Sequence, residues 1–382
     1  MKQAISRFPE NPRFDGWRMR RIAAVRSELG LLDAELLKPT LAIELSDGCS
    51  VGCWFCAFAA RRLRGVADYR SHQALFGRVV RDCIDLLGQA QRDASVLFFE
   101  TEPHDNPDYL SFLRDYEQMT GQKLFTSTAV ADDGPWLRQL LACYRDDTRR
   151  YLRINVLSTQ MLDRIHEICS PEELRRARLV MQMKDSPHPK VLSGRILKPH
   201  EGLRALGPDE DPHQLTAPQG SICCLNGFVV NLVQRTIRLI SPCHASKQWP
   251  KGYRVFDETG FVGETDFAAA LAKLMDRNMF LTPPPAKVAR WRDDLVLRMH
   301  AAGFDLTSPR QIHHFDATGS YRELGAMIAS GTLSFERIQE QLCATPDGNP
   351  LLLAGALQDL YDKGLIDESA WRRAAANRRI AC

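Results

Sequence analysis

Three cysteines lie within eight residues of one another near the start of the chain, at Cys49, Cys53 and Cys56. Their C-x3-C-x2-C spacing places three thiols on one short loop, which can hold zinc, a disulfide or an iron–sulfur cluster. The first residues contain no basic segment followed by an apolar one, so we expect a cytoplasmic protein whose 11 cysteines are reduced. A disulfide is therefore the weakest of the three interpretations.

The choice between zinc and a cluster depends on the number of ligands. A structural zinc site takes four ligands, usually as two pairs that are well separated in the sequence. No second CxxC or HxxxH pair follows at a suitable distance, which argues against zinc. Three thiolates can instead bind three irons of a [4Fe–4S] cluster and leave the fourth iron open to a substrate or cofactor. Gly48 and Gly52 would let the loop bend tightly, and Trp54 and Phe55 would shield a cluster from water.

Short apolar segments alternate with amphipathic ones over the first 245 residues. Strands are expected at 40–46, 95–100, 123–130, 151–158 and 178–184, and helices at 74–90, 108–121, 135–146 and 170–179. This alternation predicts an α/β fold of parallel βαβ units with the helices outside the sheet. A sixth strand is expected in residues 227–241, either in a hairpin or with a long return. The cysteine loop would then follow the carboxyl end of the first strand, where ligands bind in such folds.

The remaining segments define the predicted domain organisation. Residues 184–223 are rich in Pro, Gly, Asp and His, which predicts a long irregular connection. After a proline-marked break at residues 280–288, the chain is expected to be helical to its end. The spacing in residues 320–369 is typical of a helix-turn-helix or winged-helix unit. The predicted units are an N-terminal helical extension (1–38), a core (39–245), a linker and helical extension (246–319), and a helical winged-helix-like unit (320–382).

The segment "CSVGCWFC" resembles the signature of the radical S-adenosylmethionine (radical SAM) superfamily, including the aromatic residue before the third cysteine. The resemblance implies a partial (β/α)6 barrel over about residues 38–245 and a [4Fe–4S] cluster bound by Cys49, Cys53 and Cys56. It also implies that SAM binds the fourth iron. One-electron reduction, from a donor such as flavodoxin or ferredoxin, then cleaves SAM to methionine and a 5′-deoxyadenosyl radical. That radical abstracts a hydrogen atom from the substrate.

The resemblance assigns SAM-binding positions to Glu102, Ser127, Arg153, Asn155 and Ser158. Glu102 lies in "ETEP", which takes the place of the "GGEP" stretch near the SAM amino group, with Glu100 and Thr101 replacing both glycines. As isolated polar residues, the other four are more typical of ordinary sheet-end groups. Period-two alternation nevertheless predicts that Arg153 and Asn155 lie on the same face of the fourth strand.

Two further segments, "LVQRTIRLISPC" and "WPKGYRVFD", resemble the PoyD-type radical SAM peptide epimerases, which mature ribosomally made peptides. The resemblance implies a precursor peptide with a leader as the substrate. The radical would remove the α-hydrogen of an L-residue, and a cysteine thiol on the opposite face would return a hydrogen to give the D-residue. Cys243 is the first candidate for this donor, followed by Cys223 and Cys224.

Other functions stay open at this point. Within the same enzyme class, the alternatives are peptide crosslinking and backbone excision. Outside it, the alternative is a zinc- or cluster-containing regulator that binds DNA through its C-terminal helices. The net charge of +3 and the acidic balance of those helices argue against nucleic acid, and no apolar run approaches the roughly 20 residues that span a bilayer. Arginines are dense at residues 13–26 and 61–70, a pattern typical of a solvated helix face and less often of a docking surface for an acidic partner.

Overall fold

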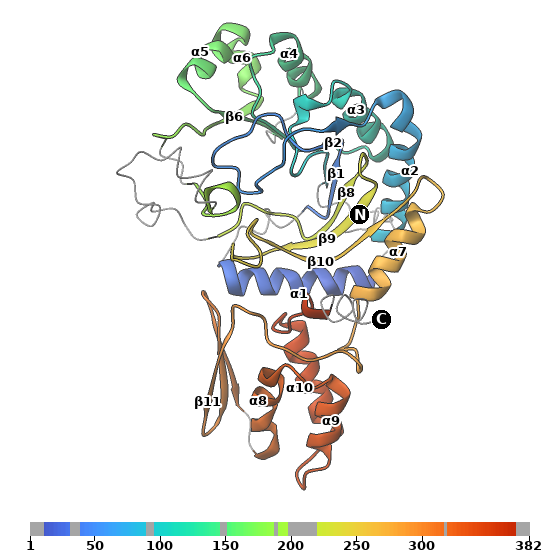
Figure 1. Ribbon diagram of the computed structural model, residues 1–382, viewed down its shortest axis with the longest axis vertical. Helices are drawn as coiled ribbons and strands as arrows, with labels where there is room; N and C mark the ends of the chain where they lie inside the picture. Colours follow the sequence, from blue (N-terminus) through green and yellow to red (C-terminus); the bar gives the residue numbers. More distant parts are fainter. Residues whose placement is uncertain are drawn as a thin grey trace, which may run out of the picture.

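The structure is a computed structural model that describes residues 11–30, 39–88, 95–145, 151–186, 190–197, 220–316 and 319–371. Much of the irregular connection predicted at 184–223, and parts of both predicted terminal units, lie outside the described residues. Figure 1 shows an upper body that runs from β1 to α7 and a lower body that runs from β11 to α10. The helix α1 (Pro12–Leu29) lies between the two.

Six parallel strands form a curved array in the upper body. They are β1 (Leu41–Glu44), β4 (Ser95–Val96), β5 (Thr126–Thr128), β6 (Leu152–Val156), β7 (Ala177–Met181) and β8 (Gly227–Asn231). β1 pairs with β8 and β4, and β6 pairs with β5 and β7, all in parallel. A single parallel bridge between Val96 and Phe125 connects β4 with β5. In the described residues β7 does not pair with β8, so the array is open rather than a closed barrel.

The sheet continues beyond β8 as antiparallel strands. β8 and β9 (Thr236–Pro242) form a hairpin, which confirms the first of the two alternatives predicted for residues 227–241. β10 (Tyr253–Gly260) pairs with β9 in the antiparallel sense and was not predicted. As a result, the last parallel strand in the sequence lies beside the first one, and the hairpin and β10 extend that edge.

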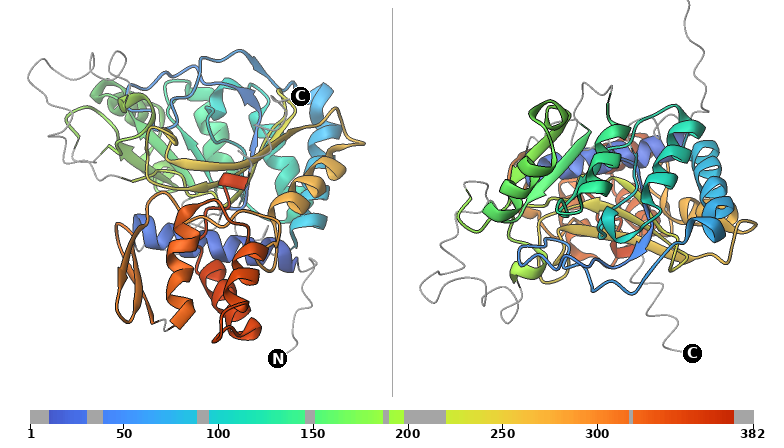
Figure 2. Two further views of the ribbon diagram at one scale, coloured as in Figure 1. Left: turned by 60° about the horizontal axis from the view of Figure 1, so that its bottom comes forward. Right: turned by 90° about the horizontal axis from the view of Figure 1, so that it is seen from above.

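Helices cover the outer face of the array, as Figure 2 shows from above. They are α2 (Tyr69–Leu87), α3 (Tyr109–Thr120), α4 (Gly134–Cys143), α5 (Thr159–Ile168), α6 (Pro171–Leu174) and α7 (Phe267–Asn278). Side chains alternate along each strand, so that Leu41 and Ile43 of β1 enter the core shared with the helices. Ala42 lies instead in a smaller core on the inner face. Among the described residues, no helix is long and apolar enough to cross a bilayer.

Most of the predicted elements of the upper body overlap elements of the structure, with bounds shifted by several residues. The helix predicted at 170–179 is wrong beyond its first turn, because α6 ends at Leu174 and β7 begins at Ala177. Pairing of β7 with β6 outweighs the helical periodicity of that segment. The helix α5 was not predicted, although its N-cap Ser158 accepts a hydrogen bond from the first turn.

The lower body has its own hydrophobic core and contains strands that were not predicted. β11 (Val296–His300), β12 (Gly303–Thr307) and β13 (Ile312–Asp316) form an antiparallel meander. The helices α8 (Glu323–Ser330), α9 (Phe335–Cys343) and α10 (Pro350–Asp362) follow in the predicted helix, turn, helix, loop, helix order. The expected helical course of residues 289–319 is therefore wrong. Because the buried core starts at Ala289, the second unit begins well before the predicted boundary at residue 320.

Buried ion pairs join α1 to both bodies. Arg254 of β10 binds Glu28 of α1 at 2.5 Å and Asp293, in the segment before β11, at 2.5 Å. On the other side, Arg20 of α1 binds Glu368 of the lower body at 3.1 Å. Arg254 and Glu28 are 5% and 2% exposed. Arg254, Glu28, Arg20 and Glu368 have lost their hydration, so each depends on its partner for stabilisation, whereas Asp293 is 41% exposed.

Replacing Arg254 with alanine should destabilise the protein by about 3–5 kcal/mol, because Glu28 would remain buried without its partner. Denaturant unfolding followed by circular dichroism measures this as a lower midpoint. Arg337→Ala is the control, since it removes an exposed pair with Glu340 and should cost less than about 1 kcal/mol. Equal midpoints for the two variants would contradict a stabilising role for the Arg254 pairs.

Candidate functional site

The three cysteines lie on a loop that follows the carboxyl end of β1. A short hairpin of β2 (Ser46–Asp47) and β3 (Gly65–Val66) forms the base of this loop. The backbone N–H of Cys49 donates to the carbonyl oxygen of Arg61 at 2.9 Å, which joins the two ends of the loop beside the hairpin. Gly48 has a φ of +96°, and a Cβ there would clash with the carbonyl group of Arg62. The predicted requirement for glycine is confirmed at this position.

A distant turn, η4 (Gly194–Leu197), holds the tip of the cysteine loop. The side chain of Arg195 donates to the carbonyl oxygens of Cys53 and Ala60, each at 2.7 Å. Its backbone N–H donates to the carbonyl oxygen of Cys56 at 2.9 Å. Gly194 approaches so closely that a Cβ would clash with the backbone of the loop. The turn thus satisfies three carbonyl groups of the cysteine loop and fixes its shape.

The three thiols are half-buried and act on one another. Burial raises the pKa of Cys49 to about 11. Burial, with the neighbouring Cys56 and Cys49 thiols, raises the pKa of Cys53 to about 12. In the part of the chain that the structure describes, no three His, Cys, Asp or Glu side chains already have the geometry of a metal site. The three cysteines nevertheless suit an iron–sulfur cluster. Their thiolates would repel one another on this restrained loop, and the bound iron ions would offset that repulsion.

Three of the predicted SAM-binding residues come together on the inner face of the array. Arg153 and Asn155 of β6 both donate to the hydroxyl oxygen of Ser127 on β5, at 2.8 and 3.0 Å. The predicted common face of the two β6 residues is therefore confirmed. Burial lowers the pKa of Arg153. No carboxylate among the described residues pairs with this guanidinium, so the inner face carries an uncompensated positive charge beside a polar group.

Glu102, another predicted SAM-binding residue, is 4% exposed and has its hydrogen-bonding capacity in use. Its carboxylate accepts from the hydroxyl of Thr128 and from the backbone N–H groups of His104, at 3.2 Å, and Ala129, at 2.9 Å. Burial raises the pKa of Glu102 to about 7. The side chain thereby connects η3 (Pro103–Asp105), which follows β4, with the end of β5 and supports the mouth of the array.

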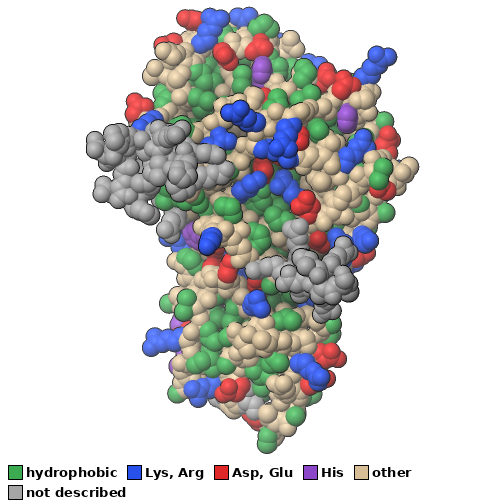
Figure 3. All heavy atoms as spheres, in the orientation of Figure 1, with side chains coloured by type: hydrophobic (Ala, Val, Ile, Leu, Met, Phe, Trp, Pro, Cys, Tyr) green, Lys and Arg blue, Asp and Glu red, His purple; other side chains and the backbone are tan. Residues whose placement is uncertain are grey.

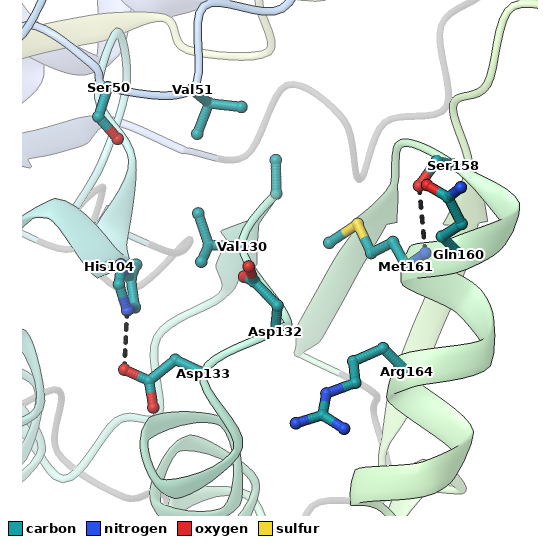
Figure 4. Close-up of a pocket in the computed structure, with 11 residues that line it drawn as sticks. Ser50, Val51, His104, Val130, Asp132, Asp133, Ser158, Gln160, Met161 and Arg164 are labelled. Atoms are coloured by element: carbon teal, nitrogen blue, oxygen red, sulfur yellow. Dashed lines mark hydrogen bonds and ion pairs between the residues drawn. The ribbon is translucent and has the colours of Figure 1, made fainter.

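A cavity of about 850 Å³ lies at the carboxyl ends of β5 and β6, as Figure 4 shows. Residues from the cysteine loop, from η3, from the start of α4 and from α5 line it, among them Ser50, Val51, His104, Asp133, Ser158 and Arg164. Ser158 is a predicted SAM-binding residue, and its hydroxyl also accepts from the N–H of Met161 at 3.1 Å. Because Ser50 and Val51 lie between Cys49 and Cys53, the cavity is in direct contact with the cysteine loop.

The three candidate hydrogen-donor cysteines differ in their burial and in their neighbours. Cys243 is 0% exposed, and the charged groups nearest to it include Arg254 and Glu28, in the layer between the sheet and α1. Cys223 is 3% exposed and belongs to the apolar core of the inner face. Cys224 is half-buried, and the Arg153 guanidinium partly offsets the rise in its pKa that burial causes. Of the three thiols, Cys224 is the one beside the polar group of the inner face.

A second, smaller hollow of about 270 Å³ lies on another side of the cysteine loop, where Gly48, Ala59 and Arg61 face it. At its floor, Glu44 and Glu100 share the guanidinium of Arg238, at 3.5 and 3.6 Å. Lys251 also binds Glu100, at 2.6 Å. The charges of this hollow neutralise one another. Its ion pairs connect β1, the segment after β4, and the β9–β10 edge of the sheet.

Comparison with known proteins gives the family of the chain. No protein-family model and no solved structure matches it. The uncharacterized protein y4wI of Sinorhizobium fredii is 36% identical over 364 residues, which cover 94% of this chain and 69% of that protein. The chain belongs to the y4wI family. Because the alignment covers nearly all of this chain, the upper and lower bodies are both shared with y4wI.

Several residues of the site were not found from the sequence of this y4wI-family protein. Arg195 is 142 positions away from Cys53, and nothing in the local sequence signals their contact. His104 and Asp133 bind each other at 3.2 Å beside the cavity. His104 follows β4 and Asp133 follows β5. The rule that ligands bind at the carboxyl ends of parallel strands could have identified both.

Replacing Gly194 with alanine should loosen the cysteine loop, because the new Cβ would clash with its backbone and φ is +63°. We expect iodoacetamide to modify Cys49, Cys53 and Cys56 of the metal-free variant about tenfold faster than in the wild type, measured for each cysteine by mass spectrometry.

Gly121→Ala is the matched control for this variant. Gly121 also has a positive φ, of +69°, but no atom lies within 4 Å of the position that its Cβ would take. The control should lose about 1 kcal/mol of stability and keep the wild-type rates of thiol modification. Wild-type rates in the Gly194→Ala variant would show that the turn does not restrain the loop.

Proposed function

We propose that this protein is a radical SAM enzyme, an isomerase that converts L- to D-residues in a ribosomally made precursor peptide. The observation that carries the proposal is the contact between a loop of three thiols and a large cavity. The loop follows the carboxyl end of a parallel strand, which is where ligands bind in α/β folds. A volume of about 850 Å³ suits a cofactor together with part of a substrate.

Cys49, Cys53 and Cys56 would hold a [4Fe–4S] cluster, with S-adenosylmethionine beside it at the cavity. When bound, these groups supply a carbon radical that removes a hydrogen atom from the substrate. The residues of the chain bind and orient them. Arg195 keeps the loop in one shape, and Arg153 offers a buried positive charge to the carboxylate of a ligand.

Glu102 acts as a positioning residue in this proposal rather than as a direct SAM contact. Both of its carboxylate oxygens already accept hydrogen bonds from the chain. Ser127 and Asn155 surround the Arg153 guanidinium and add hydroxyl and amide groups for a polar ligand. Ser158, at the rim of the cavity, is placed to contact a bound cofactor.

Epimerisation also needs a hydrogen-atom donor on the inner face, and we assign this role to Cys224 in preference to Cys243. Cys243 is 0% exposed, and the charged groups nearest to it belong to the ion pairs that join β10 to α1, whereas a hydrogen donor must be open to the substrate. Cys224 lies beside Arg153 on the inner side. The S–H bond breaks as the C–H bond of the D-residue forms. One electron from the reductant and one proton from solvent then restore the thiol.

The lower body is the part of the chain that we assign to the leader of the precursor. In the described residues, β11 and β13 each pair with one strand alone, so each has an outer edge of unpaired N–H and C=O groups. An extended peptide can add a strand to such an edge. The reaction further requires a reducing compartment, such as the cytoplasm, and an electron donor such as flavodoxin or ferredoxin.

Peptide crosslinking and backbone excision are the alternative reactions for the same site, and the mass of the product separates them. Epimerisation leaves the peptide mass unchanged in H₂O, whereas crosslinking removes two hydrogens and excision removes a larger fragment. A regulator that binds DNA through the lower body has less support. Helix α9 carries two glutamates against one arginine, and that Arg337 is paired with Glu340.

Anaerobic reconstitution with iron and sulfide should give a brown protein with about four irons per chain. After reduction, it should release 5′-deoxyadenosine from SAM. Cys53→Ala should abolish both iron uptake and SAM cleavage, because it removes one of three cluster ligands. Cys343→Ala, at the end of α9 in the lower body, is the matched control and should retain both. A colourless protein that binds zinc would contradict the proposed function.

Cys224→Ser should release 5′-deoxyadenosine at the wild-type rate and produce no D-residue, because hydrogen abstraction is retained and hydrogen return is lost. Chiral amino-acid analysis of the precursor after reaction measures this. In D₂O, the wild type should add one deuterium per converted residue, since the donor thiol exchanges with solvent. Cys243→Ser should behave as the wild type in both assays. The opposite pattern would return the donor role to Cys243.

A further inference from the structure

Three arginines lie on the limb of the loop that returns from Cys56 to β3: Arg61, Arg62 and Arg64, here called the basic limb. All three are exposed. Arg61 binds Asp47 at 2.6 Å, whereas Arg62 and Arg64 make no ion pair with any described residue. Figure 3 shows Lys and Arg side chains gathered over the middle of the upper body, where the cysteine loop passes in Figure 1. Arg62 and Arg64 therefore add positive charge that no described carboxylate pairs with.

The basic limb lies directly against the cysteines but away from the large cavity. Its backbone meets Cys49 through the hydrogen bond to Arg61 and through a parallel bridge to Arg62. The large cavity contacts the loop at Ser50 and Val51 instead, and Arg61 faces the smaller hollow. A partner on the basic limb would thus approach the cysteines without blocking the entry of a substrate.

Two aromatic residues of the same loop lie between the second and third cysteines. Trp54 and Phe55 are half-buried, with ring centroids 5.5 Å apart. The ammonium group of Lys190 lies 5.1 Å from the ring centroid of Phe55. Tryptophan and arginine are the residue types that most often dominate the energy of protein–protein binding. Their combination here is typical of a docking surface and differs from a uniformly solvated run of charges.

We propose that the basic limb, with Trp54 and Phe55, is the docking surface for a small acidic electron-carrier protein that delivers the electron to the cluster. This inference rests on the proposed function, because only a redox cluster at the three cysteines would need such a partner. Excess positive charge attracts an acidic carrier and speeds its encounter. Trp54 and Phe55 lie between two of the cysteines, so a carrier in contact with them is adjacent to the cluster ligands.

Stopped-flow reduction of the reconstituted protein by a reduced flavodoxin tests this surface. The double variant Arg62→Glu/Arg64→Glu should lower the second-order rate constant about tenfold at low salt. The difference should shrink when the ionic strength rises from about 0.02 M to about 0.2 M, because salt screens exposed charges. Reduction of the same variant by dithionite, which needs no protein docking, should stay within about twofold of the wild type.

The matched control is Arg81→Glu/Lys273→Glu, which makes the same change in net charge on α2 and α7 of the outer layer. It should behave as the wild type. A second measurement uses the protein before cluster loading, where calorimetric titration with flavodoxin should show about tenfold weaker binding for the limb variant alone.

Equal effects of the two double variants, or a limb variant with wild-type rates and affinity, would overturn the docking surface. So would a limb that binds a single-stranded DNA probe and does not bind flavodoxin. Failure of the proposed function gives a different result, since the protein would then take up no iron. Iron analysis before the kinetic experiment separates the two outcomes.

Discussion

The contact between Arg195 and the cysteine loop is the interaction on which the candidate site depends. Between β2 and β3 the loop lacks a regular strand or helix, and donors from another part of the chain bind several of its carbonyl groups. Arg195 reaches Cys53 and Ala60 with its side chain and Cys56 with its backbone. Once these carbonyl groups are fixed, the backbone that carries the three thiols is held in one shape, and Ser50 of the same loop lines the cavity.

Charge is arranged differently on the two sides of this loop. In the smaller hollow, Glu44, Glu100, Arg238 and Lys251 neutralise one another, which makes that side a structural brace. On the inner face, Arg153 is buried without a carboxylate partner among the described residues. A buried charge of this kind costs stability unless a ligand compensates it. The same protein therefore contains both a closed polar network, which holds the loop, and an open one, which is suited to binding.

The parts of the fold that depend on local periodicity could be predicted, and those that depend on distant partners could not. The strand at Leu152–Val156 and the hairpin of residues 227–241 follow from alternation and turn residues alone. Likewise, the alternation of side chains along a strand was enough to predict that Arg153 and Asn155 lie on the same face. By contrast, the contact of Arg195 with Cys53 joins residues 142 positions apart and has no local signal. The residue after Cys243, His244, binds Glu28 of α1 across 216 positions, and no local pattern records this contact.

The position of α1 has a consequence for how a long substrate would be handled. Arg254 and Arg20 connect the two bodies through α1 by buried ion pairs, so the meander and the cavity are held at a constant separation. A peptide attached to the meander would reach the cavity only with residues far enough along its length to span that separation. The molecule would then act as a ruler, which selects positions by their distance from the attachment point rather than by their side chains.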